Sequence, residues 1–263
     1  MRAYLEIVKI SIRDSFAYKF DTFVGIFTNL FFLATQVLLW KALLEYSTSI
    51  NTTLVEMALY LIIGRICITF YIDSVAYQVG HHVMEGSIAM ELIKPYYYSM
   101  KMFCISIGMS ISSFVVKSLP LVIIIPILTS MTDIEIPLGN LLLFAVALPL
   151  NMMMYWLMSY IIGLLHFILI NAGWFVRILN ETIAILGGAV IPLWYFPGAM
   201  QAICAYLPFQ LLYQFPQSLI INKITNEEIL RNFLLQLCWI GVFGIVAGLL
   251  WQFGKKRLII QGG

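Results

Sequence analysis

The sequence predicts an all-α membrane protein: six transmembrane helices, an N-terminal amphipathic interfacial helix before them, and both termini in the cytoplasm. Three observations predict this class. The 263 residues are 62% hydrophobic and only 11% charged, whereas soluble domains are roughly 25% charged. Six apolar stretches reach the length of about 20 residues that a membrane-spanning helix needs. Lys and Arg gather in alternate loops, as the positive-inside rule expects. The composition therefore excludes an ordinary soluble enzyme and a disordered chain, and a net charge of +2 is too small for a nucleic-acid binder.

The first segment, residues 1–20, has the pattern of an amphipathic helix lying in the inner membrane interface. At 100° per residue, four charged side chains fall within an arc of about 60°: Arg2, Glu6, Lys9 and Arg13. An apolar stripe lies beside them: Leu5, Val8, Ile12 and Phe16. A plain cytoplasmic extension of the first span is the alternative, and a periodicity that lasts four turns favours the interfacial helix.

The six spans follow in order along one transmembrane domain of residues 1–263. Each holds about 20 mostly apolar residues, and their ranges are 23–44, 57–79, 103–128, 141–165, 174–193 and 232–254. With the N-terminus inside, most of the 15 basic residues fall in inside segments. The loop 129–140 carries Asp133 and Glu135 and no base, as an outside loop should. The pattern predicts a multi-pass protein with cytoplasmic termini.

The sequence offers no site for chemistry of its own. It holds no G-x-x-x-x-G-K-[ST] motif and no soluble segment that could form an ATPase domain. His81 and His82 are adjacent, so on a helix they point about 100° apart instead of toward one ion. We predict no metal site, no catalytic residues and no enzyme, so any ATP used by this protein must be bound by a partner.

Three charged residues lie inside predicted spans: Arg65, Asp73 and Lys117. Each costs roughly 2.5–3.5 kcal/mol at the bilayer centre, so each should face protein or water. They either line a substrate path or form a structural pair, with Asp73 and Lys117 as the partners. The two hypotheses are evenly balanced, and the same charges would also suit an ion channel.

The segment 80–101 between the second and third spans predicts a docking element. Gly86 opens a short stretch and Pro95 closes it, and between them Ile88, Leu92 and Ile93 share a helical face. Such a face at the cytoplasmic surface would offer apolar contact to a partner. A plain interfacial loop is the alternative.

The segment 191–221 is too apolar for a free loop and too broken for a span. Four prolines interrupt it, Pro192, Pro197, Pro208 and Pro216, among the aromatic residues Trp194, Tyr195, Phe196, Phe209 and Phe215. Broken backbone at membrane depth must be buried in protein or line a cavity. The pattern predicts re-entrant outer helices before the last span.

Short motifs spread over nearly the whole chain resemble one known family. They are Trp40, Glu56-Met57 with Tyr60, Gly86-Ser87-Ile88-Ala89, Leu92-Ile93-Lys94-Pro95, Phe167 with Asn171, Gly187-Gly188, Ile191-Pro192-Leu193, Phe196-Pro197 and Leu207-Pro208-Phe209. Each is short, and their order and spacing together are fairly specific. In them the sequence resembles the permease subunit of type-2 ABC (ATP-binding-cassette) exporters, in the branch of drug or viologen exporters.

The resemblance implies a coupling helix that docks on the ATPase subunit, formed by Gly86, Ser87, Ile88, Ala89, Leu92, Lys94 and Pro95. It implies an outer gate formed by Gly187, Gly188, Pro192, Phe196, Pro197, Pro208 and Phe209. It implies a complex of two permeases, identical or related, with two ATPase subunits in the bacterial cell membrane. This chain would bind no cofactor, because ATP and Mg would sit on the ATPase partner.

The implied activity is export of a hydrophobic or amphipathic drug or antimicrobial peptide by alternating access. The path would be lined by Phe27, Phe31, Phe32, Arg65, Tyr71, Asp73 and Lys117, although aromatic side chains in spans more commonly face lipid. Three alternatives stay open. They are an ion channel or channel-like immunity protein acting alone, export of a lipid-linked or polysaccharide substrate, and a membrane enzyme acting on lipid, for which no catalytic set is present. An adjacent reading frame with a P-loop would favour the exporter.

Overall fold

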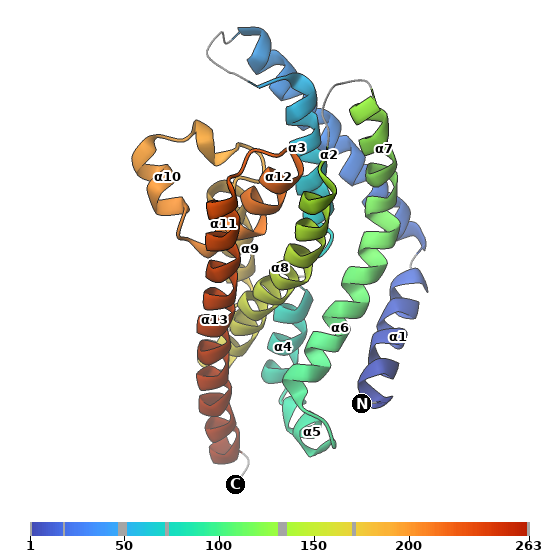
Figure 1. Cartoon of the computed structure of the whole chain (residues 1–263). Coiled ribbons are helices and arrows are strands. Elements are labelled where there is room, and N and C mark those ends of the chain that lie inside the picture. The colour runs from blue at the N-terminus through green and yellow to red at the C-terminus, as the bar shows by residue number, and fades with distance from the viewer. Residues whose placement is uncertain are drawn as a thin grey trace.

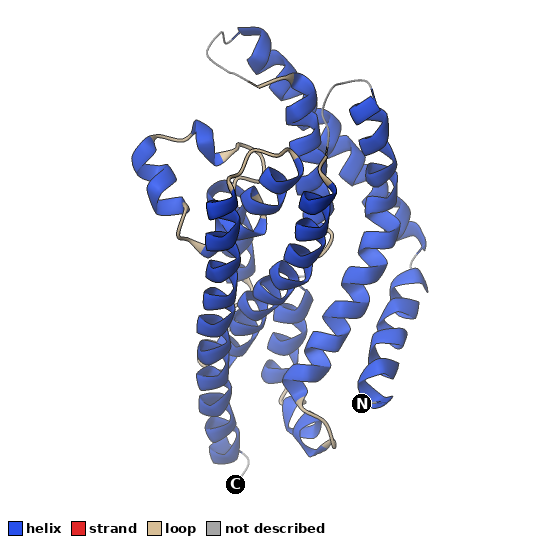
Figure 2. Ribbon diagram, viewed as in Figure 1, coloured by secondary structure: helices blue, strands red, loops and turns tan. Residues whose placement is uncertain are grey.

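A computed structural model describes residues 2–17, 19–46, 52–71, 74–130, 136–169 and 172–261. Every regular element in these ranges is helical, as Figure 2 shows. The two ends of the chain lie at the same end of the molecule, close to the short helix α5 (Ile88–Ile93) (Figure 1). An all-α fold is confirmed for the described residues.

Four helical segments are long and apolar enough to cross a membrane: Phe23–Tyr46, Tyr98–Ser130, Leu138–Phe167 and Asn226–Arg257. They contain the first, third, fourth and sixth predicted spans. In the structure they belong to α2 (Lys19–Tyr46), then α6 (Tyr98–Ser113), η1 (Phe114–Ser118) and α7 (Leu119–Ser130) in continuous succession, then α8 (Leu138–Leu164) with η2 (Leu165–Phe167), and α13 (Asn226–Gln261). The element η1 is one turn of π-helix.

The other two predicted spans are not single helices of span length. The range 57–79 is divided between α3 (Leu54–Ile68) and α4 (Ser74–Met84). The first of these ends where the Thr69 hydroxyl donates to the Ile66 carbonyl at 2.7 Å, which caps the last turn. The range 174–193 contains α9 (Trp174–Leu186), which ends at a pair of glycines. Hydropathy runs through both breaks because most residues there are apolar or small, despite Thr69 and Asp73 at the first break.

The N-terminal segment forms α1 (Arg2–Ala17), which packs along α6. The two helices approach closely because the residues at their contact, Ser11 and Gly108, are small. A Cβ on Gly108 would lie 2.6 Å from Cβ of Ser11. The four charged side chains predicted to share a face are exposed, and Lys9 binds Glu6 at 2.7 Å. A helix is observed over these residues and the structure shows which side of it contacts the protein, whereas its position in the membrane interface stays a prediction.

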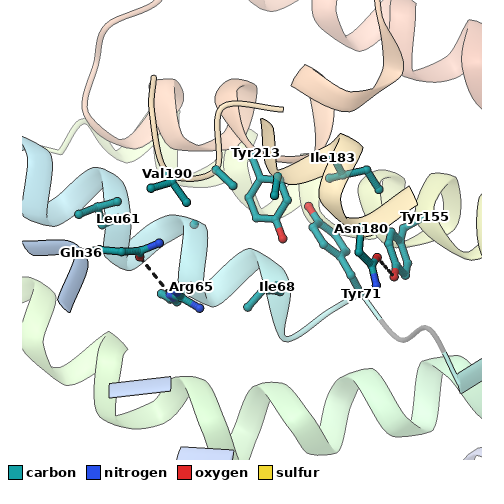
Figure 3. A pocket seen from close by; sticks show the side chains of 13 residues that line it. Gln36, Leu61, Arg65, Ile68, Tyr71, Tyr155, Asn180, Ile183, Val190 and Tyr213 are labelled. Atoms are coloured by element: carbon teal, nitrogen blue, oxygen red, sulfur yellow. Dashed lines mark hydrogen bonds between the residues drawn. The ribbon is translucent and has the colours of Figure 1, made fainter. Parts of the chain in front are cut away.

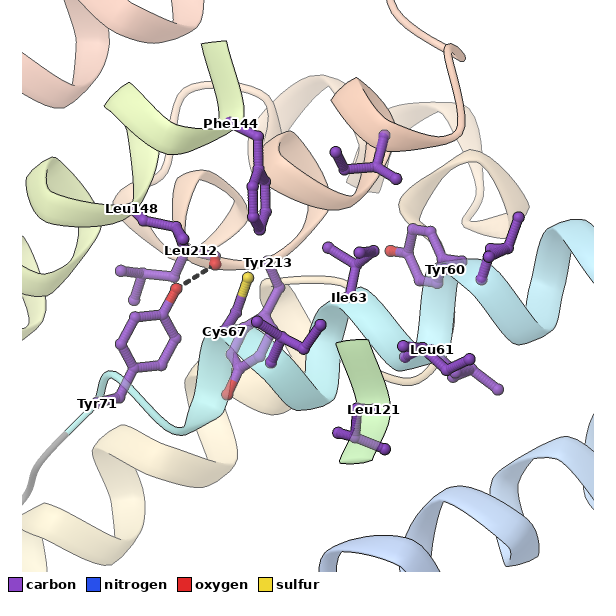
Figure 4. Packing of buried hydrophobic residues seen from close by; sticks show 14 of the residues in the cluster. Tyr60, Leu61, Ile63, Cys67, Tyr71, Leu121, Phe144, Leu148, Leu212 and Tyr213 are labelled. Atoms are coloured by element: carbon purple, nitrogen blue, oxygen red, sulfur yellow. Dashed lines mark hydrogen bonds between the residues drawn. The ribbon is translucent and has the colours of Figure 1, made fainter. Parts of the chain in front are cut away.

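The core surrounds α3, which packs against α2, α7 and α12 (Gln214–Ile220). The side chains of α3 are buried on every face of the helix, as expected for a helix that is apolar all round. Figure 4 shows part of this cluster, in which Cys67 of α3 lies beside Leu212 of α11 (Pro208–Leu212), and Leu121 of α7 lies on the opposite side of α3. A second cluster joins α4, α6, α8 and α13 nearer the termini.

The predicted broken segment 191–221 consists of short helices. These are η3 (Leu193–Tyr195), α10 (Gly198–Cys204), α11 and α12. Prolines stand at their starts: Pro192 precedes η3, Pro197 precedes α10 and Pro208 is the first residue of α11. Proline suits these positions because the first residues of a helix have no partner for their N–H groups.

Candidate functional site

A cavity of about 500 Å³ lies between α2, α3 and the third span. It contains four of the seven residues predicted for the substrate path. Its lining is Val24, Gly25, Thr28, Asn29, Phe32, Arg65, Ile68, Thr69, Tyr71, Ser113 and Lys117. We call it the basic cavity, because its charged side chains are Arg65 and Lys117.

A second cavity of about 310 Å³ adjoins the basic cavity and extends toward α9 (Figure 3). Arg65, Ile68 and Tyr71 line both. The Arg65 Nε donates to Gln36 Oε1 at 3.2 Å, and its guanidinium lies 5.2 Å from the centre of the Phe32 ring. Arg65 therefore stands between the two cavities, held by an amide on one side and an aromatic ring on the other.

Lys117 enters the basic cavity from the π-helix turn η1. Its side chain crosses Gly25, where a Cβ would lie 2.9 Å from Lys117 Cε. Asn29 Nδ2 donates to the Lys117 carbonyl at 3.4 Å. Among the described residues, no carboxylate forms an ion pair with Arg65 or Lys117. Asp73, predicted for the same path, lies outside the described residues.

The remaining predicted path residues are aromatic, and they separate into two groups. Phe27 and Phe31 are 65% and 60% exposed, stack on each other at 6.4 Å and line neither cavity. Phe32 reaches the basic cavity. Tyr71 is buried, and its hydroxyl donates to the Leu212 carbonyl, which ties the turn after α3 to α11. The structure therefore brings Phe32, Arg65, Tyr71 and Lys117 together and places the other two phenylalanines on the surface.

The predicted gate glycines lie in a network of buried hydrogen bonds. Gly188 has φ of +75°, and its carbonyl accepts from the Tyr60 hydroxyl. That hydroxyl also lies 2.7 Å from Gln214 Oε1, and Gln214 N–H donates to the Gly187 carbonyl at 2.9 Å. From the first span, Trp40 Nε1 donates to the Val190 carbonyl at 3.1 Å. The loop after α9 is thus tied to α2, α3 and α12.

Gln214 was not among the predicted gate residues, although its amide holds this network together. Its Oε1 also accepts from Leu193 N–H at 3.1 Å, at the start of η3. The available signal was a glutamine in an apolar segment, because a buried amide needs hydrogen-bond partners. Of the predicted gate residues that follow, Pro192 and Pro208 are buried, Phe196 and Phe209 are half-buried and Pro197 is exposed.

The predicted apolar face of the docking helix is wrong in one residue. Ile88 is fully buried against the cluster that contains Tyr98 and Met102, so it anchors α5 to its own chain. The exposed apolar residues are Met90 at 66%, Ile93 at 78% and, to a lesser extent, Leu92 at 41%. In a six-residue helix the tertiary anchor decides which face is inward, and periodicity alone does not reveal the anchor.

A charged cluster fixes the end of this segment. Glu91 accepts from Lys94 Nζ at 2.5 Å, from Lys101 Nζ at 2.6 Å and from the Tyr96 hydroxyl at 3.1 Å. Burial opposes ionisation of Glu91, but the hydrogen bonds from Lys101 and Lys94 outweigh it and lower its pKa to about 2. The sequence prediction missed Glu91, although Glu and Lys three residues apart are a known stabilising pair.

The segment before α6 is also joined to α1. Tyr97 N–H donates to the Tyr4 hydroxyl at 3.0 Å. The Glu91 cluster and this bond hold α5 at the end of the molecule where the chain begins and ends (Figure 1). The remaining predicted residues of the segment lie in and beside α5. Gly86, which has φ of +70°, and Ser87 precede the helix, Ala89 lies within it and Pro95 follows it.

Two comparisons bear on what this arrangement belongs to. No curated protein matches the chain in sequence. A family model described as ABC-2 family transporter protein matches residues 27–262, which include the gate and α5 residues described above and all of the cavity lining except Val24 and Gly25. The chain is therefore a multi-pass membrane protein that belongs to the ABC-2 family of transporter proteins.

Proposed function

We propose that this protein is the permease subunit of an ATP-driven ABC exporter for a hydrophobic or amphipathic molecule, such as a drug or an antimicrobial peptide. Members of its family are membrane transport components. ATP and Mg bind to separate ATPase subunits, and a second permease, identical or related, completes the pathway in the bacterial cell membrane. The observation that carries this proposal is the exposed apolar face of α5, which Ile88 and Glu91 anchor at one end of a molecule of the ABC-2 family.

The geometry of α5 suits it as the contact for an ATPase. Met90, Leu92 and Ile93 present apolar surface beside the charged side chains of Lys94 and Glu91. An exposed apolar patch with a polar rim is typical of a protein interface. Ile88 belongs to the buried cluster that joins α4, α6, α8 and α13, so a displacement of α5 would be transmitted to that cluster.

Six membrane crossings are part of the proposal, with the two broken spans counted as crossings. In this arrangement α3 and α4 together form the second crossing. The fifth crossing is formed by α9 with the short helices that follow it, and it ends on the outer side. Both termini and α5 then face the cytoplasm, and α1 lies in the inner interface with its charged side chains toward water. Interrupted helices are tolerated at membrane depth where protein surrounds them. Here α11 and α12 are surrounded by α3, α8, α9 and α13.

The transport step is a rigid-body change between inward-open and outward-open states. Movement of α5 is carried through Ile88 to α6, whose continuation η1 bears Lys117 of the basic cavity. The network at Gly188 links α2 and α3 to the short outer helices. One connected set of helices thus joins the ATPase contact, the cavity and the outer gate.

The test co-expresses the chain with a P-loop ATPase from a neighbouring reading frame of its genome and purifies any complex that the two form. Replacing Met90→Ser and Ile93→Ser together should abolish co-purification and permease-dependent ATPase activity, because the contact loses its apolar surface. These residues are exposed, so the fold should persist, as thermal unfolding can show.

The matched control is Ile203→Ser, which alters an equally exposed apolar residue (63%) on the short helix α10 in the predicted outer segment. It should leave both readouts unchanged. Normal coupling in the double variant would contradict the assignment of α5. ATP-independent conductance from the purified chain would favour the ion-channel alternative instead.

A further inference from the structure

We propose that the basic cavity binds the anionic headgroup of an amphipathic molecule, such as a phosphate or carboxylate carried on an apolar tail. This proposal rests on the proposed function in one respect: it narrows the class of cargo. The site itself is argued from the cavity alone, and the test below separates the two.

The first argument is that two cationic side chains line one cavity at membrane depth. Lys117 lies 13 residues before the end of the 33-residue span Tyr98–Ser130, which is about 20 Å along a helix. Arg65 is half-buried at the same cavity. Ionisable groups inside a membrane are expensive and frequently mark substrate pathways.

The second argument is the arrangement of neutral groups around the cations. Thr28, Asn29 and Ser113 line the same cavity and add hydroxyl and amide hydrogen-bond donors. An oxyanion is held best by such a mixture, because charged and neutral donors together satisfy its several lone pairs. The Phe32 ring and Ile68 supply apolar wall beside the donors. One polar end and one apolar side match the two ends of an amphiphile.

The third argument is the local backbone. Lys117 sits in the single described π-helical turn, a feature that occurs frequently at functional sites. Facing it is Gly25, the one residue type that leaves room for the lysine stem. The widened turn and the missing side chain together aim the ammonium group into the cavity.

A cationic peptide or drug fits this cavity poorly, because it would meet two like charges in a medium of low dielectric constant. Among hydrophobic or amphipathic cargoes, those with an acidic group are therefore favoured. A resident anionic lipid offers the same chemistry, so the experiment must separate a cargo from a lipid.

The test measures binding to the full chain in nanodiscs of zwitterionic phosphatidylcholine. The probes are three fluorescent alkyl amphiphiles with the same tail and a phosphate, phosphocholine or trimethylammonium headgroup. The phosphate probe should bind at least tenfold more tightly than the other two. Arg65→Gln and Lys117→Gln should each weaken its binding on the order of tenfold, the value of one charge-assisted hydrogen bond.

Two further variants keep the test independent of folding. Gly25→Ala removes no charge but displaces the Lys117 stem, so it should weaken the phosphate probe selectively. Lys41→Gln removes an exposed cation from the same helix outside the cavity and should change nothing. Equal binding of all three probes, or equal effects of Lys41→Gln and Lys117→Gln, would overturn the proposal.

An ATPase assay of the complex separates the two sources of the anion. If the phosphate probe stimulates ATP hydrolysis and Lys117→Gln abolishes the stimulation, the cavity holds cargo. If the probe binds without stimulation, the cavity holds a resident anionic lipid, and the anion site still stands. If no complex with an ATPase forms, the proposed function fails while the binding result remains.

Discussion

Glu91 is the single side chain on which the geometry of the α5 segment depends most. Its carboxylate is 10% exposed and accepts three hydrogen bonds, two of them from lysines. Replacing Glu91→Gln leaves Lys94 and Lys101 without their acceptor. We expect a loss of unfolding free energy on the order of 1–3 kcal/mol at pH 7, measured by denaturation in detergent.

The pH dependence of the same variant has a definite sign. The pKa of Glu91 is lowered from 4.5 to about 2, so the carboxylate stabilises the fold fully above pH 4.5. The stability difference between the native protein and Glu91→Gln should therefore stay constant from pH 7 to about 5 and shrink as pH falls toward 2. A difference that grows with acid would contradict this account.

Gly188 tests the network at the predicted gate. With φ of +75°, any other residue is strained there, and a Cβ would lie 2.7 Å from Gln214 Oε1. Gly188→Ala should therefore cost the backbone strain of about 1–2 kcal/mol and also disturb the amide. The matched control is Gly86→Ala, because Gly86 has φ of +70° and open space around it. Equal loss of stability in the two variants would show that Gln214 contributes nothing.

At the scale of elements, α8 and α13 are joined by a buried amide pair. Gln236 Nε2 donates to Asn151 Oδ1 at 2.6 Å, and both residues are fully buried. Gln236→Leu or Asn151→Leu alone should destabilise the protein because each leaves the other amide unpaired. The double variant should recover part of the loss, with a coupling energy of about 0.6–1.7 kcal/mol in a double-mutant cycle. Strict additivity would contradict a direct bond.

Hydropathy predicted the four long helices but not the breaks in the other two spans. The residues around Thr69 and Tyr71 are apolar enough on average to pass as part of a span, and the hydrogen bonds of Thr69 and Tyr71 within the fold reveal the turn. The start of α13 has a signal in the sequence, because Thr225 and Glu228 have the spacing of a capping box. In the structure the Thr225 hydroxyl accepts from Glu228 N–H at 3.3 Å.

Some site residues could likewise be predicted from the sequence, and others could not. Arg65 and Lys117 stood out because charge is rare in a span, and the structure places both at one cavity. Gln214 and Glu91 were missed because their importance lies in contacts with residues distant in sequence or in a folded turn. The inward direction of Ile88 was missed for the same reason.

At the scale of the whole molecule, the end that holds α5 and the opposite end should be accessible from opposite sides of the membrane. Cys67, Cys104 and Cys204 are buried, so only exposed Cys238 needs to be replaced. In that background, Tyr46→Cys (92% exposed) should react with an impermeant maleimide in intact cells. Met84→Cys (60% exposed), near α5, should react only after lysis. Labelling of both in intact cells would contradict the proposed topology.

The central claim is that this chain supplies a pathway whose energy comes from a separate ATPase. The most direct measurement is uptake of a fluorescent amphiphile into inside-out vesicles that contain the chain with its ATPase partner. The account predicts accumulation that requires ATP on the outside, is lost in the Met90→Ser and Ile93→Ser double variant, and is absent when the chain is reconstituted alone. Equal flux without ATP or without the partner would contradict it.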